Sequence, residues 1–81
     1  MPQVEIRLPE LGEDGPDEAT ISFFMVSEGE DVEQEQEVAE VLTDKATFNV
    51  VSPANGKIKQ ILVEEDERVK VGHVLAIVET A

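Results

Sequence analysis

A direct repeat constrains the fold of this chain more than any other feature of its sequence. Residues 20–44 and residues 57–81 align without a gap when the chain is shifted against itself by 37 positions. Both copies run through an apolar segment, an acidic turn, a valine, a polar turn and a second apolar segment. Two such copies are expected to pack face to face, because neither buries its apolar side chains alone. The identical pairs are Ile21/Ile58, Val26/Val63, Glu28/Glu65, Glu30/Glu67, Val32/Val69, Ala39/Ala76, Val41/Val78 and Thr43/Thr80.

The apolar segments are typical of short β-strands with turn residues between them. Residues 4–8 alternate apolar and polar side chains, as a half-buried strand does. Residues 28–37 are rich in Glu and Gln, but their apolar side chains are too sparse for the buried face of a helix. The sequence therefore predicts an all-β unit of seven or eight strands, a small sandwich or flattened barrel with pseudo-twofold symmetry. Strands are expected at 4–8, 21–26, 38–43, 47–51, 58–63 and 74–78, with the strongest turn signal at Asn55-Gly56.

Size and charge limit what the unit does. The 81 residues form one domain, and the absence of cysteine excludes disulfides and thiolate zinc sites. The net charge of −13 argues against nucleic acid and against anionic membrane surfaces as partners. No apolar run approaches the ~20 residues of a membrane span, and no signal peptide or Arg-rich transit peptide is visible at the start. The chain is expected to be cytosolic or an excised part of a longer protein.

One of the few cations occupies an unusual position. Lys45 follows Asp44 at the end of the first copy, between the strands expected at 38–43 and 47–51. Only two or three residues remain to reverse the chain direction, which predicts a tight hairpin with its tip in solvent. Lys45 is therefore expected to project from a rigid corner of the domain.

At this point the sequence resembles the lipoyl domains of 2-oxo acid dehydrogenase complexes. The triad Asp44-Lys45-Ala46 between two strands is similar to the lipoylation site of that family. A lone triad means little, but the resemblance covers nearly all of the chain and places the triad at the midpoint of the repeat. The supporting segments are Pro9-Glu10-Leu11-Gly12-Glu13, Glu28-Gly29-Glu30-Asp31-Val32, Ser52-Pro53 with Gly56, Asp66 to Val69, and Val71-Gly72.

The resemblance implies a fold and a function. The fold is two four-stranded sheets packed as a flattened barrel with twofold pseudo-symmetry, and the domain comprises residues 1–81. The function is that of a non-catalytic carrier: lipoic acid, amide-linked to Lys45, shuttles acyl groups and electrons between active sites. The implied partners are a lipoate ligase or lipoyl transferase, a 2-oxo acid decarboxylase, an acyltransferase core and dihydrolipoamide dehydrogenase. The implied location is the cytoplasm in bacteria or archaea, or the mitochondrial matrix in a eukaryote.

The resemblance also suggests which residues a partner reads. In the family, the loop after the first strand lies near the lysine and helps a dehydrogenase recognise its domain. This chain departs from the family pattern at Leu42, where Glu is common, at Val51, where Pro is common, and at Glu35-Gln36, which lacks a Gly. Which dehydrogenase reads the domain therefore stays open. The recognition candidates are Gly12, Glu13, Asp14, Gly15, Asp17, Glu18 and Leu42.

Other functions fit the sequence less well. A biotin carrier domain shares the architecture, but its lysine normally lies between two Met residues, where this chain has Asp44 and Ala46. The lipoyl carrier of glycine cleavage is longer and has flanking helices. A calcium-binding or acidic interaction module is suggested by the carboxylates of residues 28–31 and 64–67, although their spacing does not match an EF-hand. No metal site is expected. No catalytic site is expected either, because His73 is the one possible base for Ser22, Ser27 or Ser52 and it lies in an expected turn.

Overall fold

The computed structural model describes residues 2–12 and 15–80, and this part of the chain contains strands and turns but no helix. It therefore holds no helix long and apolar enough to cross a membrane. The strands are β1 (Gln3–Arg7), β2 (Glu18–Phe24), β3 (Asp31–Val32), β4 (Glu37–Leu42), β5 (Thr47–Val51), β6 (Gly56–Ile61), β7 (Arg68–Lys70) and β8 (Val74–Glu79).

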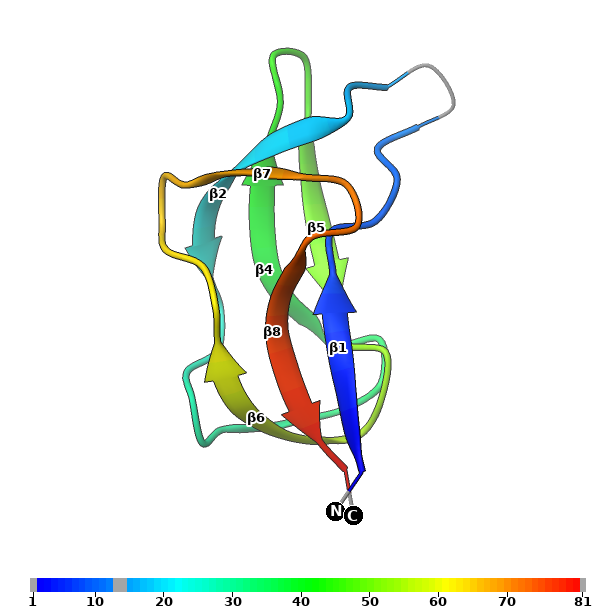
Figure 1. The fold of residues 1–81 in the computed structure, drawn as a ribbon, viewed down its shortest axis with the longest axis vertical. Coiled ribbons are helices and arrows are strands. Elements are labelled where there is room, and N and C mark those ends of the chain that lie inside the picture. The colour runs from blue at the N-terminus through cyan, green and yellow to red at the C-terminus, as the bar shows by residue number, and fades with distance from the viewer. Residues whose placement is uncertain (1, 13–14, 81) are drawn as a thin grey trace.

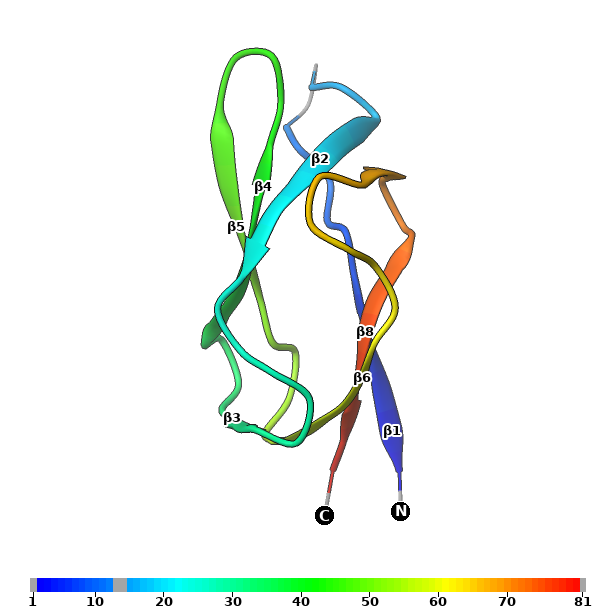
Figure 2. The same cartoon turned by 90° about the vertical axis from the view of Figure 1, so that its left-hand side faces the viewer.

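The strands form two antiparallel sheets, in the orders β1-β8-β6-β3 and β5-β4-β2-β7. Figures 1 and 2 show the two sheets facing each other as layers of an elongated body. In the described residues no strand pairing joins one sheet to the other, so the architecture is a sandwich and not a closed barrel. The all-β fold with two four-stranded sheets is confirmed.

Each sheet takes two strands from one copy of the repeat, one short strand from the other copy and one edge strand, β1 or β5, from outside the copies. The same hydrogen bonds recur in the two halves. Gly29 N donates to Ile58 O at 2.7 Å, and the equivalent Asp66 N donates to Ile21 O at 2.7 Å. Even the unusual backbone angles match: Gly29 and Asp66 both have positive φ, and so do Glu35 and Gly72. The pseudo-twofold symmetry predicted from the repeat is thus present in the backbone.

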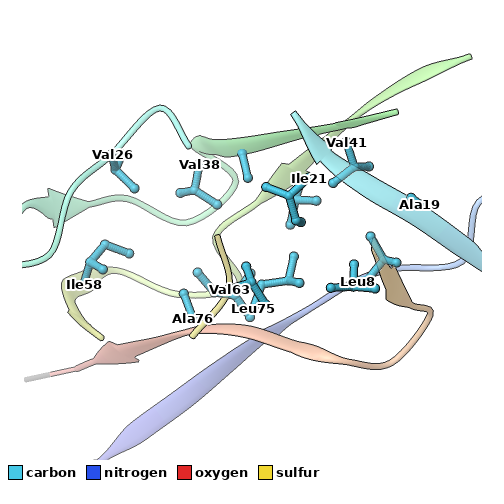
Figure 3. Close-up of a cluster of buried hydrophobic side chains, with 14 of the residues drawn as sticks. Leu8, Ala19, Ile21, Val26, Val38, Val41, Ile58, Val63, Leu75 and Ala76 are labelled. Carbon is cyan, nitrogen blue, oxygen red and sulfur yellow. The ribbon is translucent and has the colours of Figure 1, made fainter. Parts of the chain in front are cut away.

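The core lies between the sheets and consists of the apolar side chains that the repeat aligns. Figure 3 shows Ile21, Val38 and Val41 from one sheet directed toward Ile58, Leu75 and Ala76 from the other. All six are at most 1% exposed. Burial of this apolar surface is the main stabilising contribution in a domain without disulfides.

Two expectations from the sequence need correction. Asn55-Gly56 is not a turn with positive φ: Gly56 begins β6, and neither residue has positive φ. The glycine is required there because a Cβ would come within 2.4 Å of the carbonyl oxygen of Glu79. The strand expected at residues 21–26 begins earlier, at Glu18, because β7 pairs with its polar start.

Ser52 stabilises the crossing between the halves. It is the buried polar side chain of the core region, and its hydroxyl donates a 2.7 Å hydrogen bond to Ala54 O. Its backbone N donates to Gln36 O at 2.9 Å, and its carbonyl accepts from Glu35 N at 2.7 Å. Leu8 makes the same two backbone contacts with His73 and Gly72 in the other half, so Ser52 and Leu8 are equivalent positions.

Candidate functional site

The hairpin that joins β4 to β5 forms one end of the molecule. Figure 1 places its tip at the upper end of the long axis, which measures 37 Å, against 23 and 17 Å for the other two axes. The strands below the tip are paired from Leu42/Thr47 to Glu37/Val51, with one register shift between Ala39 and Glu37 at the end far from the tip. Val41 and Val50, which point from these strands into the core, are at most 2% exposed. The tip is therefore anchored to the core by two paired strands.

Asp44 and Lys45 are the two residues at the tip, and Thr43 fixes their conformation. Thr43 N donates to Ala46 O at 2.9 Å and closes the turn. The Thr43 hydroxyl oxygen accepts hydrogen bonds from Ala46 N at 3.1 Å and from Lys45 N at 3.4 Å. Neither tip residue has positive φ, so the turn needs no glycine. The tight hairpin expected around Lys45 is confirmed.

The Lys45 side chain is exposed, as are those of Asp44 and Ala46 on either side. Among the residues that the structure describes, its ammonium group is within ion-pair distance of no carboxylate. An amine in this position is open to the active site of another enzyme, and its acylation would break no ion pair in the described part of the chain. The residues present therefore fit an amide-linked prosthetic group on Lys45 Nζ.

A shallow groove of about 710 Å³ lies beside Lys45. Its walls are the end of the loop before β2, the start of β2 and the β4–β5 tip. Of the recognition candidates, Gly15, Asp17, Glu18 and Leu42 line this groove, whereas Gly12 does not. The structure thus brings a loop far away in the sequence next to the lysine. Glu13 and Asp14, the remaining candidates, lie outside the described residues.

Two glycines shape that loop. Gly12 has a φ of +113°, and its carbonyl accepts a 3.1 Å hydrogen bond from Gly15 N. A Cβ on Gly15 would lie 2.2 Å from Leu11 O, so a side chain at this position would displace the backbone. These two candidates therefore have a structural role in positioning the loop.

Other residues of the groove had no separate signal in the sequence. Thr20, Phe48 and Arg68 also line it, and Arg68 lies 3.9 Å from the Glu18 carboxylate. The sequence predicted Phe48 only as part of a strand, and Arg68 belongs to β7, a strand too short to be predicted from its sequence. Thr43 did carry a signal, because it is identical to Thr80 in the other copy.

The acidic turns have structural contacts of their own. Glu30 Oε1 accepts a hydrogen bond from Ser27 N at 3.2 Å, and the equivalent Glu67 Oε1 accepts from Glu64 N at 3.0 Å. These carboxylates close the turns in which they lie. Within residues 2–12 and 15–80, no three side chains of the metal-binding types gather as a cation site. His73 is exposed after the turn before β8, as expected.

Comparison with known proteins agrees with this geometry. Residues 4–78 match the Biotin_lipoyl family model, described as "Biotin-requiring enzyme". The chain is 42% identical over 73 residues to the dihydrolipoyllysine-residue acetyltransferase component of the pyruvate dehydrogenase complex of Corynebacterium glutamicum. It is 36% identical over 76 residues to the lipoamide acyltransferase component of the branched-chain alpha-keto acid dehydrogenase complex of Bacillus subtilis. These matches cover 90% and 94% of this chain but only 11% and 18% of the relatives.

Solved structures give the same picture. The lipoyl domain of the 2-oxoglutarate dehydrogenase complex of Azotobacter vinelandii superposes with a TM-score of 0.73 at 25% identity, over 96% of this chain and 99% of that one. The urea carboxylase of Kluyveromyces lactis contains a region with the same fold, with a TM-score of 0.81 at 16% identity, covering 98% of this chain and 6% of that one. The chain belongs to the Biotin_lipoyl family and is a carrier domain of the lipoyl type.

Proposed function

We propose that Lys45 Nζ carries lipoic acid in amide linkage and that the domain shuttles acyl groups and electrons within a 2-oxo acid dehydrogenase complex. The observation that supports this best is the Asp44-Lys45-Ala46 tip, exposed and fixed by Thr43 at one end of the molecule. The acyltransferase relatives support lipoyl over biotin.

The chain's own residues supply position, not catalysis. The protonated Lys45 amine must lose a proton before it attacks an activated carboxyl group, and the partner ligase supplies that base. The bond formed is an amide, which removes the positive charge of the side chain. When attached, the dithiolane supplies a disulfide that is reduced as an acyl group is taken up. The strands below the tip fix the base of the arm, while the exposed side chain leaves it free to move.

The partners in this proposal are of two kinds. A lipoate ligase or lipoyl transferase loads the lysine, and the complex supplies a 2-oxo acid decarboxylase, the acyltransferase core and dihydrolipoamide dehydrogenase. The groove beside Lys45 is where the decarboxylase reads the domain, through Gly15, Asp17, Glu18 and Leu42. Its mixed lining of carboxylates and apolar side chains suits discrimination between partners better than tight binding.

The proposal is tested by loading the domain in cells. The chain is produced with a lipoate ligase and supplied lipoate, and in parallel with a biotin ligase and biotin, and intact masses are measured. We expect one lipoyl group per chain, located on Lys45 by peptide mapping, and no biotin. Biotin on Lys45 would instead support a carboxylase carrier, and lipoyl on another lysine would overturn the site. Lys57→Arg, at an exposed position of β6, is the control that should load normally.

A further inference from the structure

The outer faces of the two sheets differ, although their strands are equivalent. On the sheet β5-β4-β2-β7 and directly after the end of β2, four large apolar side chains are between 39% and 43% exposed: Phe23, Met25, Leu42 and Val51. The repeat and the shared hydrogen bonds identify their counterparts on the other sheet as Gln60, Leu62, Glu79 and Arg7. Three of the four apolar positions are thus polar or charged on the opposite face, so the apolar character is not a requirement of the fold.

The apolar side chains surround two carboxylates on the central strand β4. Phe23 pairs in register with Glu40, and Glu40 pairs with Asn49 on the far side. Val51 pairs with Glu37, and Met25 N donates to Val38 O beside it at 2.8 Å. We name this surface the outer patch. It comprises Phe23, Met25, Glu37, Glu40, Leu42 and Val51.

The carboxylates of the outer patch lack a cation of their own. Asn49 Nδ2 donates a 2.8 Å hydrogen bond to Glu37 Oε1, which holds that carboxylate on the face. In the described part of the chain, the three ion pairs include neither Glu37 nor Glu40. The cations of the same sheet, Arg68 and Lys70, lie on β7 beside residues 18–20, on the far side of β2 from β4.

The negative charge of the molecule narrows the kinds of partner that could bind to the outer patch. A second copy would bring two acidic patches and two chains of net charge −13 together, which is unfavourable. Nucleic acid and anionic lipid are repelled for the same reason. A protein surface that presents Arg or Lys among apolar side chains could form ion pairs with the two carboxylates and pack against the apolar side chains around them.

We propose that the outer patch is a docking surface for a protein partner that presents cationic side chains flanked by apolar ones. The patch lies on the strands and not on the tip, so docking leaves Lys45 accessible. Leu42 belongs both to the patch and to the groove beside Lys45, so a docked partner would reach the edge of that groove. This inference does not depend on which prosthetic group the lysine carries.

The test uses model peptides and amide chemical shifts of the 15N-labelled domain. The probe is acetyl-Leu-Arg-Phe-Arg-Leu-amide. One control replaces its apolar residues with serine, and the other replaces arginine with glutamate. We expect saturable shifts of amides in β2, β4 and β5 with the probe, and weaker or no saturation with either control. Equal shifts on both sheets, or equal response to the serine peptide, would overturn the proposal, because they indicate attraction by net charge alone.

Variants sharpen the test. Phe23→Gln installs the residue that the other sheet has at the same position, so the fold should tolerate it. We expect it to weaken probe binding about fivefold or more. Glu40→Gln is expected to weaken it about two- to fivefold. Glu5→Gln, on the outer face of the other sheet, is the control and should leave binding unchanged. Unchanged binding in Phe23→Gln, or shifts of the patch that grow with domain concentration alone, would contradict a foreign partner.

Discussion

The two ends of the molecule are built alike and used differently. At one end, Thr43 N and its hydroxyl both donate to Ala46 O, at 2.9 and 3.2 Å. At the other end, Thr80 N and its hydroxyl both donate to Pro2 O, also at 2.9 and 3.2 Å. Asp44 and Lys45 join the strands at the first end, whereas the second end holds the start and finish of the described chain (Figure 1). The same pair of hydrogen bonds forms at both ends, with and without a connection between the strands, so the fold does not need a lysine there.

The largest functional difference between the two ends is expected to depend on the Lys45 amine, and the first test removes it. Lys45→Gln should abolish lipoylation completely and change the free energy of unfolding by no more than about 0.5 kcal/mol, because the side chain is exposed and forms no ion pair in the described part of the chain. Intact mass after production with ligase gives the first quantity, and thermal melting gives the second. Residual lipoyl modification, or a marked loss of stability, would contradict a purely chemical role for this residue.

A second test uses a difference between the ends in the space available for a Cβ atom. Gly56 and Ala19 immediately precede the two copies of the repeat and so occupy equivalent positions; Ala19 lines the groove beside Lys45 and is 4% exposed. Gly56→Ala should destabilise the domain by about 2–3 kcal/mol, because its Cβ would meet Glu79 O at 2.4 Å. Ala19→Gly should cost less, about 1 kcal/mol, because it removes one buried methyl group and loosens the strand. Urea denaturation measures both, and a smaller effect for Gly56→Ala would show that β6 and β8 move apart easily.

Thr43 and Thr80 allow a matched comparison of the corners themselves. The Thr43 hydroxyl bonds to three backbone groups and the Thr80 hydroxyl to one. Thr43→Val should cost about 1 kcal/mol and slow lipoylation, whereas Thr80→Val should cost about 0.5 kcal/mol and leave lipoylation unchanged. Amide hydrogen exchange at Ala46 and single-turnover ligase kinetics are the readouts. Equal lipoylation rates in the two variants would show that the ligase does not require an ordered tip.

The smallest effect is expected at Glu35, one of two equivalent positions with positive φ. Glu35 has a φ of 69°, and its counterpart Gly72 has a φ of 90°. Glu35→Gly should stabilise the domain by a few tenths of a kcal/mol. The substitution relieves backbone strain in the folded state, but it also raises the conformational entropy of the unfolded chain, and the two effects largely cancel. Gly72→Ala should destabilise it by about 1 kcal/mol. Calorimetric melting compares them, and a destabilised Glu35→Gly variant would mean that the Glu35 side chain makes contacts that outweigh the strain.

The sequence predicted the parts of the fold that depend on the repeat. The aligned apolar segments became the core, and the acidic turns recurred where the copies placed them. β3 and β7 escaped recognition because each presents a single buried valine, Val32 or Val69, within two or three residues. The turn signal at Asn55-Gly56 was misleading because close approach of another strand, and not positive φ, requires the glycine.

The candidate site was predictable in part for a similar reason. Lys45 was found from the position of a cation between two strands, which is local information. The groove beside it depends on the loop before β2 meeting the β4–β5 tip, and no local pattern records that contact. The outer patch was hidden as well, because the register shift between Ile21 and Phe23 changes which side chains face outward.

The hydrogen bonds between Thr80 and Pro2 also determine how the domain would be tethered. Any linker continuing from either residue would leave from one common point, at the opposite end of the 37 Å long axis from the β4–β5 tip. Such a linker would stay clear of an enzyme that encloses the amine. The body itself would then act as a rigid spacer that adds its length to the reach of the arm.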